Sequence, residues 1–365
     1  MNYEYSSVFK HLEKLVSFDT QNPPRKINKE SDVFKYLCSQ LTDFETTFID
    51  AGDGCLSLLA KRGSPDILFN FHIDTVPIAE GWTSNPHQLI QQDNKLVALG
   101  ACDIKGASAC MLSAVNQAKG DIALLFSSDE EHGSSEAIKK FLTTEHGFKK
   151  AIVAEPTLAK AVTAHRGIQT AIASFTGIPG HASEARAYKD NAIHKAGEWI
   201  SAAINWVGSQ TQQVQNLSGL PFNIGTIEGG IKANMIASNC ELKFGFRPLP
   251  GQSSKDVLST LTQLENDQSG VKITSGFFGP CLPAANQNFE DSIIKAKQLA
   301  SQLEIEEGDA VSFWTEASLF SQAGLTTFVF GPGDIAQAHT ANEWVDISQL
   351  EKVEQIYINY LSQTK

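Results

Sequence analysis

The stretch at residues 125–135 places three carboxylates directly after an apolar run. Its sequence, LFSSDEEHGSS, begins as a segment typical of a buried strand and continues into Asp129, Glu130 and Glu131. Adjacent like charges repel, and a solvated turn does not require three acids at the mouth of a buried strand. The pattern therefore indicates that positive charge lies near this strand end.

Other expected strand ends carry further groups that can bind a metal. His72 and Asp74 close the run DILFNFHIDT, Glu155 lies in KAIVAEPT, Asp103 in the turn GACDIKG and His339 in AHTANE. In open α/β sheets, sites gather at the carboxyl ends of strands. Imidazoles and carboxylates together form a mixed nitrogen and oxygen shell for divalent metals. Two metals that share one carboxylate would hold a nucleophilic water and polarise a carbonyl.

Each motif also has an ordinary interpretation. A His-x-Asp pair is usually only hydrogen bonded, an Asp-Glu-Glu run is usually solvated surface, and Glu-Pro marks a turn. We expect His132 to be an exposed loop residue and Asp129 to form a turn. Because every motif follows a buried strand or a Gly-rich turn, the set as a whole favours a metal site.

The hydrophobic pattern predicts an α/β fold with a second domain inserted into the first. Runs typical of buried strands alternate with helical patterns up to about residue 166, and the same type of pattern returns after about residue 278. Between them, the order strand, helix, strand, strand, helix, strand is that of the ferredoxin-like βαββαβ arrangement. We therefore expect a helix-covered mixed sheet from residues 1–166 and 278–365, and a small domain from residues 167–277. The expected elements of the small domain are residues 169–177, 191–207, 221–230, 235–248, 253–267 and 270–278.

Charge and cysteine content restrict the class of protein. A formal charge of −12 argues against nucleic acid or an anionic membrane surface as the main partner. No stretch approaches the roughly 18 apolar residues of a membrane span. The first 18 residues lack the pattern of a signal peptide and predict an amphipathic helix. Six cysteines without a CxxC pair favour reduced thiols and a cytoplasmic location.

Six motifs occur in a fixed order along the chain: FHIDTVP, GACDIKG, SSDEEHG, AEPT, GIPGHAS and AHTANE. Together they resemble the M20 family of dinuclear zinc amidohydrolases, and the resemblance covers essentially the whole chain. The segments WTEASLF and FGPGDIAQAHTANE are most similar to the acetylornithine deacetylase branch, and especially to its acetylcitrulline deacetylase relatives. The resemblance implies a metal-binding catalytic domain with an inserted lid and dimerisation domain. It also implies two divalent ions per chain, zinc first, with cobalt or manganese as substitutes.

The resemblance identifies five residues as metal ligands. Asp103 matches the carboxylate that bridges both metals. His72 and Glu155 match the remaining ligands of one metal, and Glu131 and His339 match those of the other.

The same resemblance assigns catalytic roles next to the ligands. Glu130 matches the general base, and Asp74 matches the carboxylate that orients His72 through its other ring nitrogen. The peptide between Asp103 and Ile104 is expected to be cis. Cys102 has no basic residue arranged to activate it, so we expect it to take no part in catalysis.

The inserted domain is implied to supply the groups that bind the substrate. His181 matches a histidine that contacts the substrate carbonyl or its oxyanion, and in dimeric members it comes from the partner subunit. Asn234 and Arg247 match residues that bind the polar groups and the α-carboxylate of the substrate, a task that suits the planar guanidinium. For His165, structural and functional roles are equally supported.

The resemblance implies hydrolysis of an N-acetylated amino acid by a homodimeric enzyme. We expect N2-acetyl-L-ornithine as the substrate, in arginine biosynthesis, ahead of N-acetyl-L-citrulline. A succinyl-diaminopimelate desuccinylase or a dipeptidase of the family comes next, and a non-catalytic binding protein last. An ornithine pocket requires a carboxylate or open water for the ammonium group, whereas a ureido pocket requires neutral partners. Glu316 and Glu343 are the acidic residues nearest to the motifs, and the sequence does not show where they point.

Overall fold

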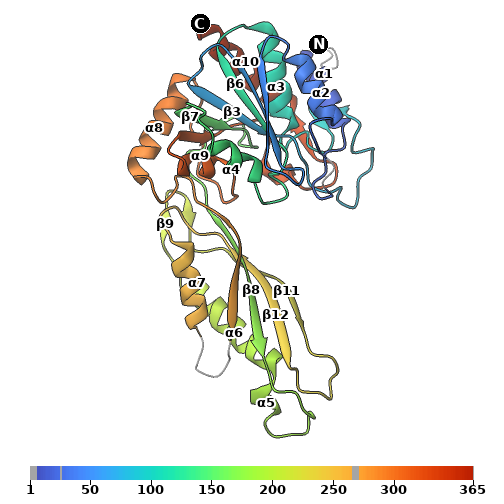
Figure 1. Cartoon of the computed structure of the whole chain (residues 1–365), viewed down its shortest axis with the longest axis vertical. Coiled ribbons are helices and arrows are strands. Elements are labelled where there is room, and N and C mark those ends of the chain that lie inside the picture. The colour runs from blue at the N-terminus through green and yellow to red at the C-terminus, as the bar shows by residue number, and fades with distance from the viewer. Residues whose placement is uncertain (1–5, 25–26, 265–270, 365) are drawn as a thin grey trace. The chain divides into compact units, whose positions relative to one another are not determined.

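The computed structural model describes residues 6–24, 27–264 and 271–364, and its contacts divide the chain into two compact units (Figure 1). The sheet unit comprises Met1–Thr163, Glu290–Asp309 and Thr315–Lys365, and the inserted unit comprises Ala164–Phe289 and Ala310–Trp314. The inserted unit is larger than residues 167–277, because the backbone of His165 pairs with both Leu282 and Val311. Among the described residues, no helix has both the length and the apolar character needed to cross a membrane.

A mixed six-stranded sheet forms the centre of the sheet unit and confirms the expected fold class. Four strands run parallel, and the first two strands of the chain are antiparallel to their neighbours. Every residue of the two central strands is buried, as in a strand that is covered on both faces. In spatial order, the strands are β1 (Glu45–Asp50), β2 (Leu56–Arg62), β6 (Ile122–Ser127), β3 (Ile67–His72), β7 (Lys150–Val153) and β14 (Thr326–Val329).

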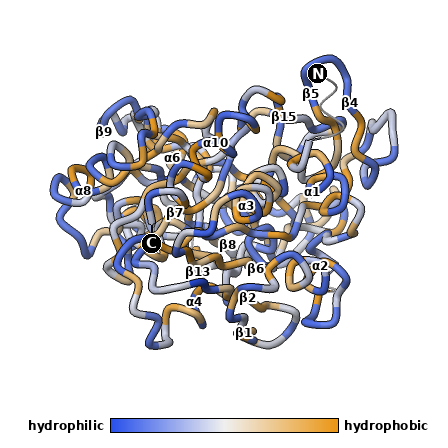
Figure 2. Tube along the Cα trace, turned by 90° about the horizontal axis from the view of Figure 1, so that it is seen from above, coloured by the Kyte–Doolittle hydropathy of each residue, from blue (hydrophilic) through white to orange (hydrophobic). Residues whose placement is uncertain are grey.

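Helices and a small second sheet complete this unit. In Figure 2 the trace of β6 and β7 is hydrophobic, whereas much of the outer loop trace is hydrophilic. The helices are α1 (Ser7–Val16), α2 (Asp32–Gln40), α3 (Lys105–Gln117), α4 (Glu136–Leu142), α8 (Phe289–Gln302), α9 (Ala317–Gln322), the 3₁₀ helix η2 (Ile335–Gln337) and α10 (Ile347–Gln363). The small antiparallel sheet has the order β15 (Trp344–Asp346), β5 (Lys95–Val97) and β4 (Ile90–Gln92).

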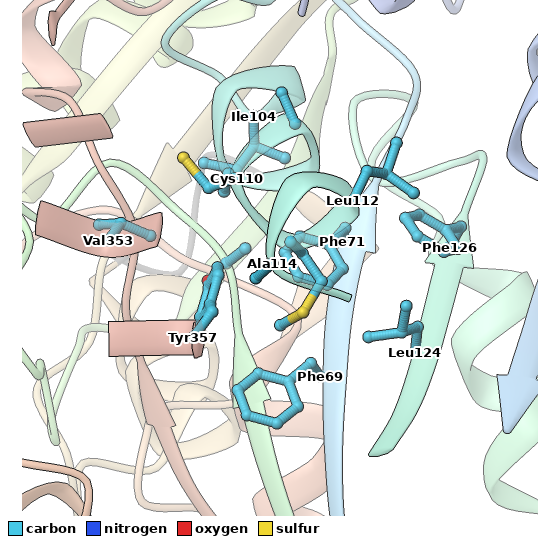
Figure 3. Packing of buried hydrophobic residues seen from close by; sticks show 14 of the residues in the cluster. Phe69, Phe71, Ile104, Cys110, Leu112, Ala114, Leu124, Phe126, Val353 and Tyr357 are labelled. Atoms are coloured by element: carbon cyan, nitrogen blue, oxygen red, sulfur yellow. The ribbon is translucent and has the colours of Figure 1, made fainter. Parts of the chain in front are cut away.

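The core of the sheet unit lies between β3, β6, α3 and α10 (Figure 3). The Phe69 and Tyr357 rings pack edge to face with centroids 5.7 Å apart, and Phe71 stacks on Phe126 at 5.5 Å. Helix α3 is buried over its first eleven residues, so it is apolar or small on all sides rather than amphipathic. Its one charged residue, Lys105, donates from its ammonium group to the carbonyl of Phe18 at 3.1 Å. This packing fixes the strands whose ends carry the candidate ligands.

The inserted unit has the expected ferredoxin-like topology. Its chain order is β8, α6, β11, β12, α7, β13, and its antiparallel sheet has the spatial order β11, β12, β8, β13. The expected helix at residues 253–267 is observed as α7, and residues 265–267 lie outside the described residues. The elements are β8 (Ile168–Thr176), α5 (Ala187–Asp190), α6 (Ala192–Gly208), β9 (Gln213–Val214), β10 (Leu217–Ser218), β11 (Phe222–Gly229), β12 (Asn239–Phe246), α7 (Ser254–Gln263) and β13 (Lys272–Gly279).

One face of the inserted sheet packs against helices. Alternate residues of β8, including Ala173 and Phe175, are buried in a core that contains Trp199 of α6. The Trp199 indole donates to the carbonyl of Leu261 in α7 at 2.9 Å, which ties the two helices together. The residues between them on β8 remain half-buried on the other face, the period-two pattern of a sheet covered on one side.

Candidate metal centre

The parallel strands of the sheet unit bring the candidate ligands to one edge. β3 ends at His72, the turn after β6 carries Glu130 and Glu131, and Glu155 follows β7 by two residues. Strand β3 pairs with β6 on one side and with β7 on the other, so these three ends are neighbours. His339 comes from the loop after β14, which lies next to β7.

Asp103 lies between the two imidazoles. Its Oδ1 is 3.0 Å from His72 Nε2, and its Oδ2 is 3.4 Å from His339 Nε2. The two oxygens of one carboxylate therefore face two different histidines. This is the arrangement that a bridging ligand needs.

The other two carboxylates divide between these histidines. Glu131 Oε1 lies 3.2 Å from His339 Nε2, and Glu155 Oε1 lies 3.9 Å from His72 Nε2. His72, Asp103 and Glu131 also each offer one possible ligand atom, and these three atoms lie within 4.8 Å of one another. The five predicted ligands are thus brought together as two three-residue groups that share Asp103. Mixed imidazole and carboxylate ligands of this kind suit zinc and related divalent ions.

Burial and mutual contact shift the protonation of these groups strongly. Burial opposes ionisation of Asp103, but hydrogen bonds from His339 and His72 hold the pKa of its carboxyl below the usual range. Hydrogen bonds to Asp103 and Glu131 raise the pKa of His339 to about 10. Burial raises the pKa of Glu155 well above its usual value, and negative charge on Asp103 adds to this shift. Groups such as His339 and Glu155 thus hold their protons more tightly than usual. A divalent cation bound by the cluster could replace these protons, as expected of a metal centre.

Asp74 contacts His72 through its backbone carbonyl rather than through the carboxylate that the resemblance implied. The His72 ring donates from Nδ1 to the backbone carbonyl of Asp74 at 3.1 Å, and the nearer carboxylate oxygen is 3.7 Å away. The carboxylate instead accepts from the backbone amides of Glu130 at 3.3 Å and Glu131 at 2.9 Å. The backbone of Asp74 therefore orients the histidine, and its side chain fixes the acidic turn.

Glu130 lies beside this cluster with the properties expected of a general base. Burial raises the pKa of its carboxyl well above the usual value, and negative charge on Glu155 raises it further. A carboxylate with a raised pKa is a better proton acceptor near neutral pH. Its neighbour Asp129 has a structural role, as expected, because one of its oxygens accepts from the amides of Glu136 at 2.6 Å and Ala137 at 3.3 Å at the start of α4. His132 is exposed in the same turn, as expected.

Glu343 positions the bridging residue, a role that the sequence did not reveal. Its Oε1 accepts from the amides of Cys102 at 2.8 Å and Asp103 at 2.9 Å, and its Oε2 accepts from the amide of Gly100 at 2.9 Å. The peptide between Asp103 and Ile104 is cis, as expected. The only signal in the sequence was an acid four residues after His339.

Cys102 is fully buried next to the bridging ligand. Its thiol donates to the carbonyl of Asp334 at 3.4 Å, and burial raises its pKa far above the usual value. A buried thiol with a raised pKa is a poor nucleophile. These features agree with the prediction that Cys102 takes no part in catalysis.

The predicted residues of the inserted unit occupy different parts of it. His181 is exposed, its Nδ1 is 2.7 Å from the Ser183 hydroxyl, and the carbonyl of Asn234 accepts from the amide next to it in sequence, that of Ala182. His181 and Asn234 thus belong to one loop cluster. Arg247 follows β12 and lines a cavity of about 650 Å³ over the half-buried face of the sheet.

His165 has a structural role within the inserted unit. Its side chain is fully buried, and its Nδ1 lies 2.7 Å from the carbonyl of Arg166. Its backbone amide donates to Leu282 and its carbonyl accepts from the same residue. The structure therefore favours the structural one of its two expected roles.

Known proteins match the chain over most of its length. The model of peptidase family M20/M25/M40 matches residues 68–363. An N-acetyl-L-citrulline deacetylase from Xanthomonas campestris is 46% identical over 349 residues, which cover 95% of each chain. An acetylornithine deacetylase from Erwinia tasmaniensis is 31% identical over 80% of this chain and 78% of its own.

Solved structures share the fold at low sequence identity. The M20 family metallo-carboxypeptidase Sso-CP2 from Sulfolobus solfataricus superposes with a TM-score of 0.75 at 14% identity, covering 98% of this chain and 99% of that one. The YXEP protein of Bacillus subtilis, described as a dinuclear metal-binding peptidase from the M20 family, has a TM-score of 0.68 at 15% identity, with 97% and 96% covered. The fold, the bridged ligand cluster and the match along most of the sequence agree, and the chain belongs to the M20 family of metal-dependent amidohydrolases.

Proposed function

We propose that this chain is an N-acetyl-L-citrulline deacetylase, which hydrolyses the acetamide bond of its substrate to L-citrulline and acetate. The observation that carries this proposal is the 46% identity to a deacetylase of that name over 95% of both chains. Acetylornithine deacetylases are more distant, at about 30% identity over about four fifths of the chain. This order reverses the expected preference for acetylornithine, which rested on its deacetylase being the commoner member of the branch.

The two acids considered for an ornithine pocket also support a neutral substrate side chain. Glu316 and Glu343 are each only 1% exposed, and both carboxyl groups accept hydrogen bonds from within the sheet unit. Because both side chains are buried, neither is positioned to pair with the ammonium group of a ligand. A buried ammonium without a partner is costly, whereas a ureido group needs only neutral donors and acceptors.

The ligand geometry indicates how the chain would hold two metals. His72, Asp103 and Glu155 would bind one ion, and Asp103, Glu131 and His339 the other. We infer zinc as the physiological metal, with cobalt or manganese as substitutes. Bound at this position, such ions lower the pKa of a water and polarise the amide carbonyl.

Glu130 performs the proton transfers in the proposed mechanism. Its carboxylate takes the proton from the attacking water and returns it to the leaving amine. Asp74 keeps Glu130 in place, because the Asp74 carboxylate accepts from the Glu130 amide. In the inserted unit, we propose that His181 binds the carbonyl oxygen as it gains charge. Asn234 and Arg247 then bind the polar groups and the α-carboxylate.

We further propose a homodimer that forms through the inserted unit. Strand β11 is an edge of its sheet, and exposed strand edges readily pair with another chain. Large apolar side chains are exposed on β11, on α6 and in the loop after β11: Ile193, Ile204, Ile227, Ile231 and Met235. Such a surface suits a second copy of the chain. None of the six cysteines, all of which lie in the described part of the chain, forms a disulfide, in agreement with a reducing location such as the cytoplasm.

A comparison of kcat/KM for the two acetylated amino acids tests the substrate. We expect N-acetyl-L-citrulline to be preferred by at least about tenfold, because one well-matched polar group discriminates by at least that much. A preference for N2-acetyl-L-ornithine would reject the assignment within the branch. Turnover of only succinyl-diaminopimelate or dipeptides would reject the branch, and no acetate release from any of these would favour a binding protein.

A further inference from the structure

Glu316 is a buried carboxyl group behind the metal centre that the mechanism does not use. It precedes α9 and contacts the ends of two central strands. Its Oε2 accepts from the Ser127 hydroxyl at 3.1 Å and from the Asn70 amide at 3.1 Å, in the amide orientation that lets the Asn70 oxygen accept from Phe71. Asn70 precedes His72 by two residues in sequence, and Ser127 is the last residue of β6. Glu316 therefore ties together the strands that lead to a metal ligand and to the general base.

The second oxygen of Glu316 is less well supplied with donors than the first. Oε1 is buried and has no hydrogen-bond partner among the described residues. Two neighbouring oxygens, Asp129 Oδ1 and Ser135 Oγ, likewise make no hydrogen bond within the described part of the chain, and the only hydrogen among these three oxygens is that of the Ser135 hydroxyl. An ionised carboxylate with a buried, unpaired oxygen is strongly unfavourable. A proton on Glu316 Oε1 would supply a second hydrogen to this group of three oxygens.

The charges around Glu316 point the same way. No lysine or arginine contacts its carboxyl group among the interactions of the described residues. Burial raises the pKa of Glu316 to about 8, and negative charge on Asp129 adds to this shift. The titratable groups that act on Glu316 or respond to it are His72, Asp74, Asp129, Glu130 and Glu155. Of these, only His72 favours the charged form of Glu316, and the Ser135 hydroxyl favours it as well.

Glu343 provides an internal contrast. Burial raises the pKa of Glu343 to about 8 as well, so burial does not distinguish the two residues. Their hydrogen bonds do, because Glu343 accepts three backbone amides with both oxygens, whereas Glu316 leaves one oxygen unpaired. Three donors aimed at one carboxyl group suit its ionised form.

We propose that Glu316 is an uncharged carboxylic acid in the working enzyme and acts as a positioning residue for the metal centre. As an acid, it joins the ends of β3 and β6 through Asn70 and Ser127. It does so without adding a negative charge behind Glu130 and Glu155. A side chain of the same shape that is always neutral should therefore replace it.

Infrared spectroscopy of the metal-loaded protein near pH 7 tests the protonation directly. The spectrum of the wild type minus that of Glu316→Gln should contain the carbonyl band of a protonated carboxylic acid. A difference that contains only carboxylate bands would overturn the proposal. This measurement requires neither a substrate nor activity, so its failure is distinct from a failure of the proposed deacetylase function.

Kinetics and metal content test the positioning role. Glu316→Gln should keep two metals and remain within about threefold of wild-type kcat/KM, whereas Glu316→Ala should lose at least about tenfold, mainly in kcat, because it releases both strand ends. The matched control is Glu343→Gln, which should lose metal affinity because its new amide group faces backbone N–H donors. A loss of kcat/KM in Glu316→Gln as large as that in Glu316→Ala would contradict the positioning role. Full activity of Glu316→Ala would contradict it as well.

Discussion

Removal of the Glu343 carboxylate should disable both metal sites at once. Glu343→Ala leaves the backbone amides of Gly100, Cys102 and Asp103 without their acceptor, in a region where the side chain was 1% exposed. Each buried donor left unpaired costs about 1–3 kcal/mol, so even the lower end gives about 3 kcal/mol for the three. All three amides belong to the turn that presents Asp103, so this cost falls on the conformation that binds metal.

A loss of about 3 kcal/mol corresponds to roughly a hundredfold weaker binding, at about 1.4 kcal/mol per factor of ten. Competition of zinc against a chromophoric chelator measures this change directly. Glu343→Gln should lose less, because its remaining oxygen can still accept from Cys102 and Asp103 and only the Gly100 amide meets a donor. An exposed acid on the neighbouring helix, changed in Glu351→Ala, serves as the control. Wild-type zinc affinity in Glu343→Ala would refute the role assigned to these hydrogen bonds.

Three further predictions concern the centre, the inserted unit and stability. Glu130→Gln should retain two metals by elemental analysis yet lose at least about a hundredfold in kcat, the usual size of a general-base contribution; substantial activity in this variant would exclude Glu130 as the base. If His181 acts across a dimer, a mixture of His181→Ala and Glu130→Ala chains should recover part of the activity that each lacks alone, and a fully active monomer in analytical ultracentrifugation would rule this out. Burial lowers the pKa of His11 below its usual 6.5, so the unfolded chain takes up the proton first and the wild type should lose stability as pH falls below about 6.5. Urea unfolding at several pH values should show a smaller loss for His11→Gln over the same range.

The parts of the site that follow strands were predictable from the sequence. His72, Glu131 and Glu155 each come within four residues of the end of a buried apolar run, and parallel strands bring such ends to one edge. The bridging place of Asp103 required the family motif, because nothing in its spacing distinguishes it from the other acids. His339 likewise needed the motif, since it lies in a loop ten residues beyond β14.

The supporting residues could not be predicted, because their partners are backbone groups far away in sequence. Glu343 binds amides about 240 residues earlier in the chain, and no side-chain pattern records such a contact. The family resemblance assigned the Asp74 carboxylate to His72, whereas that carboxylate accepts from the amides of the acidic turn. The topology of the inserted unit was predictable from strand alternation. Its exact bounds were not, because the pairing of His165 with Val311 involves residues far outside the expected domain.

The discontinuous sheet unit has a consequence for how the chain is synthesised. Strand β7 ends at Val153, but its outer neighbour β14 begins at Thr326, about 170 residues later. At about 5–20 residues per second, a ribosome needs roughly ten to thirty seconds to produce the intervening segment. During that interval the apolar edge of β7 lacks its partner strand β14. The metal ligands that have already been synthesised also lack His339. The nascent protein is thus open to pairing between strand edges of different chains, and metal can be captured at the complete centre only near the end of translation.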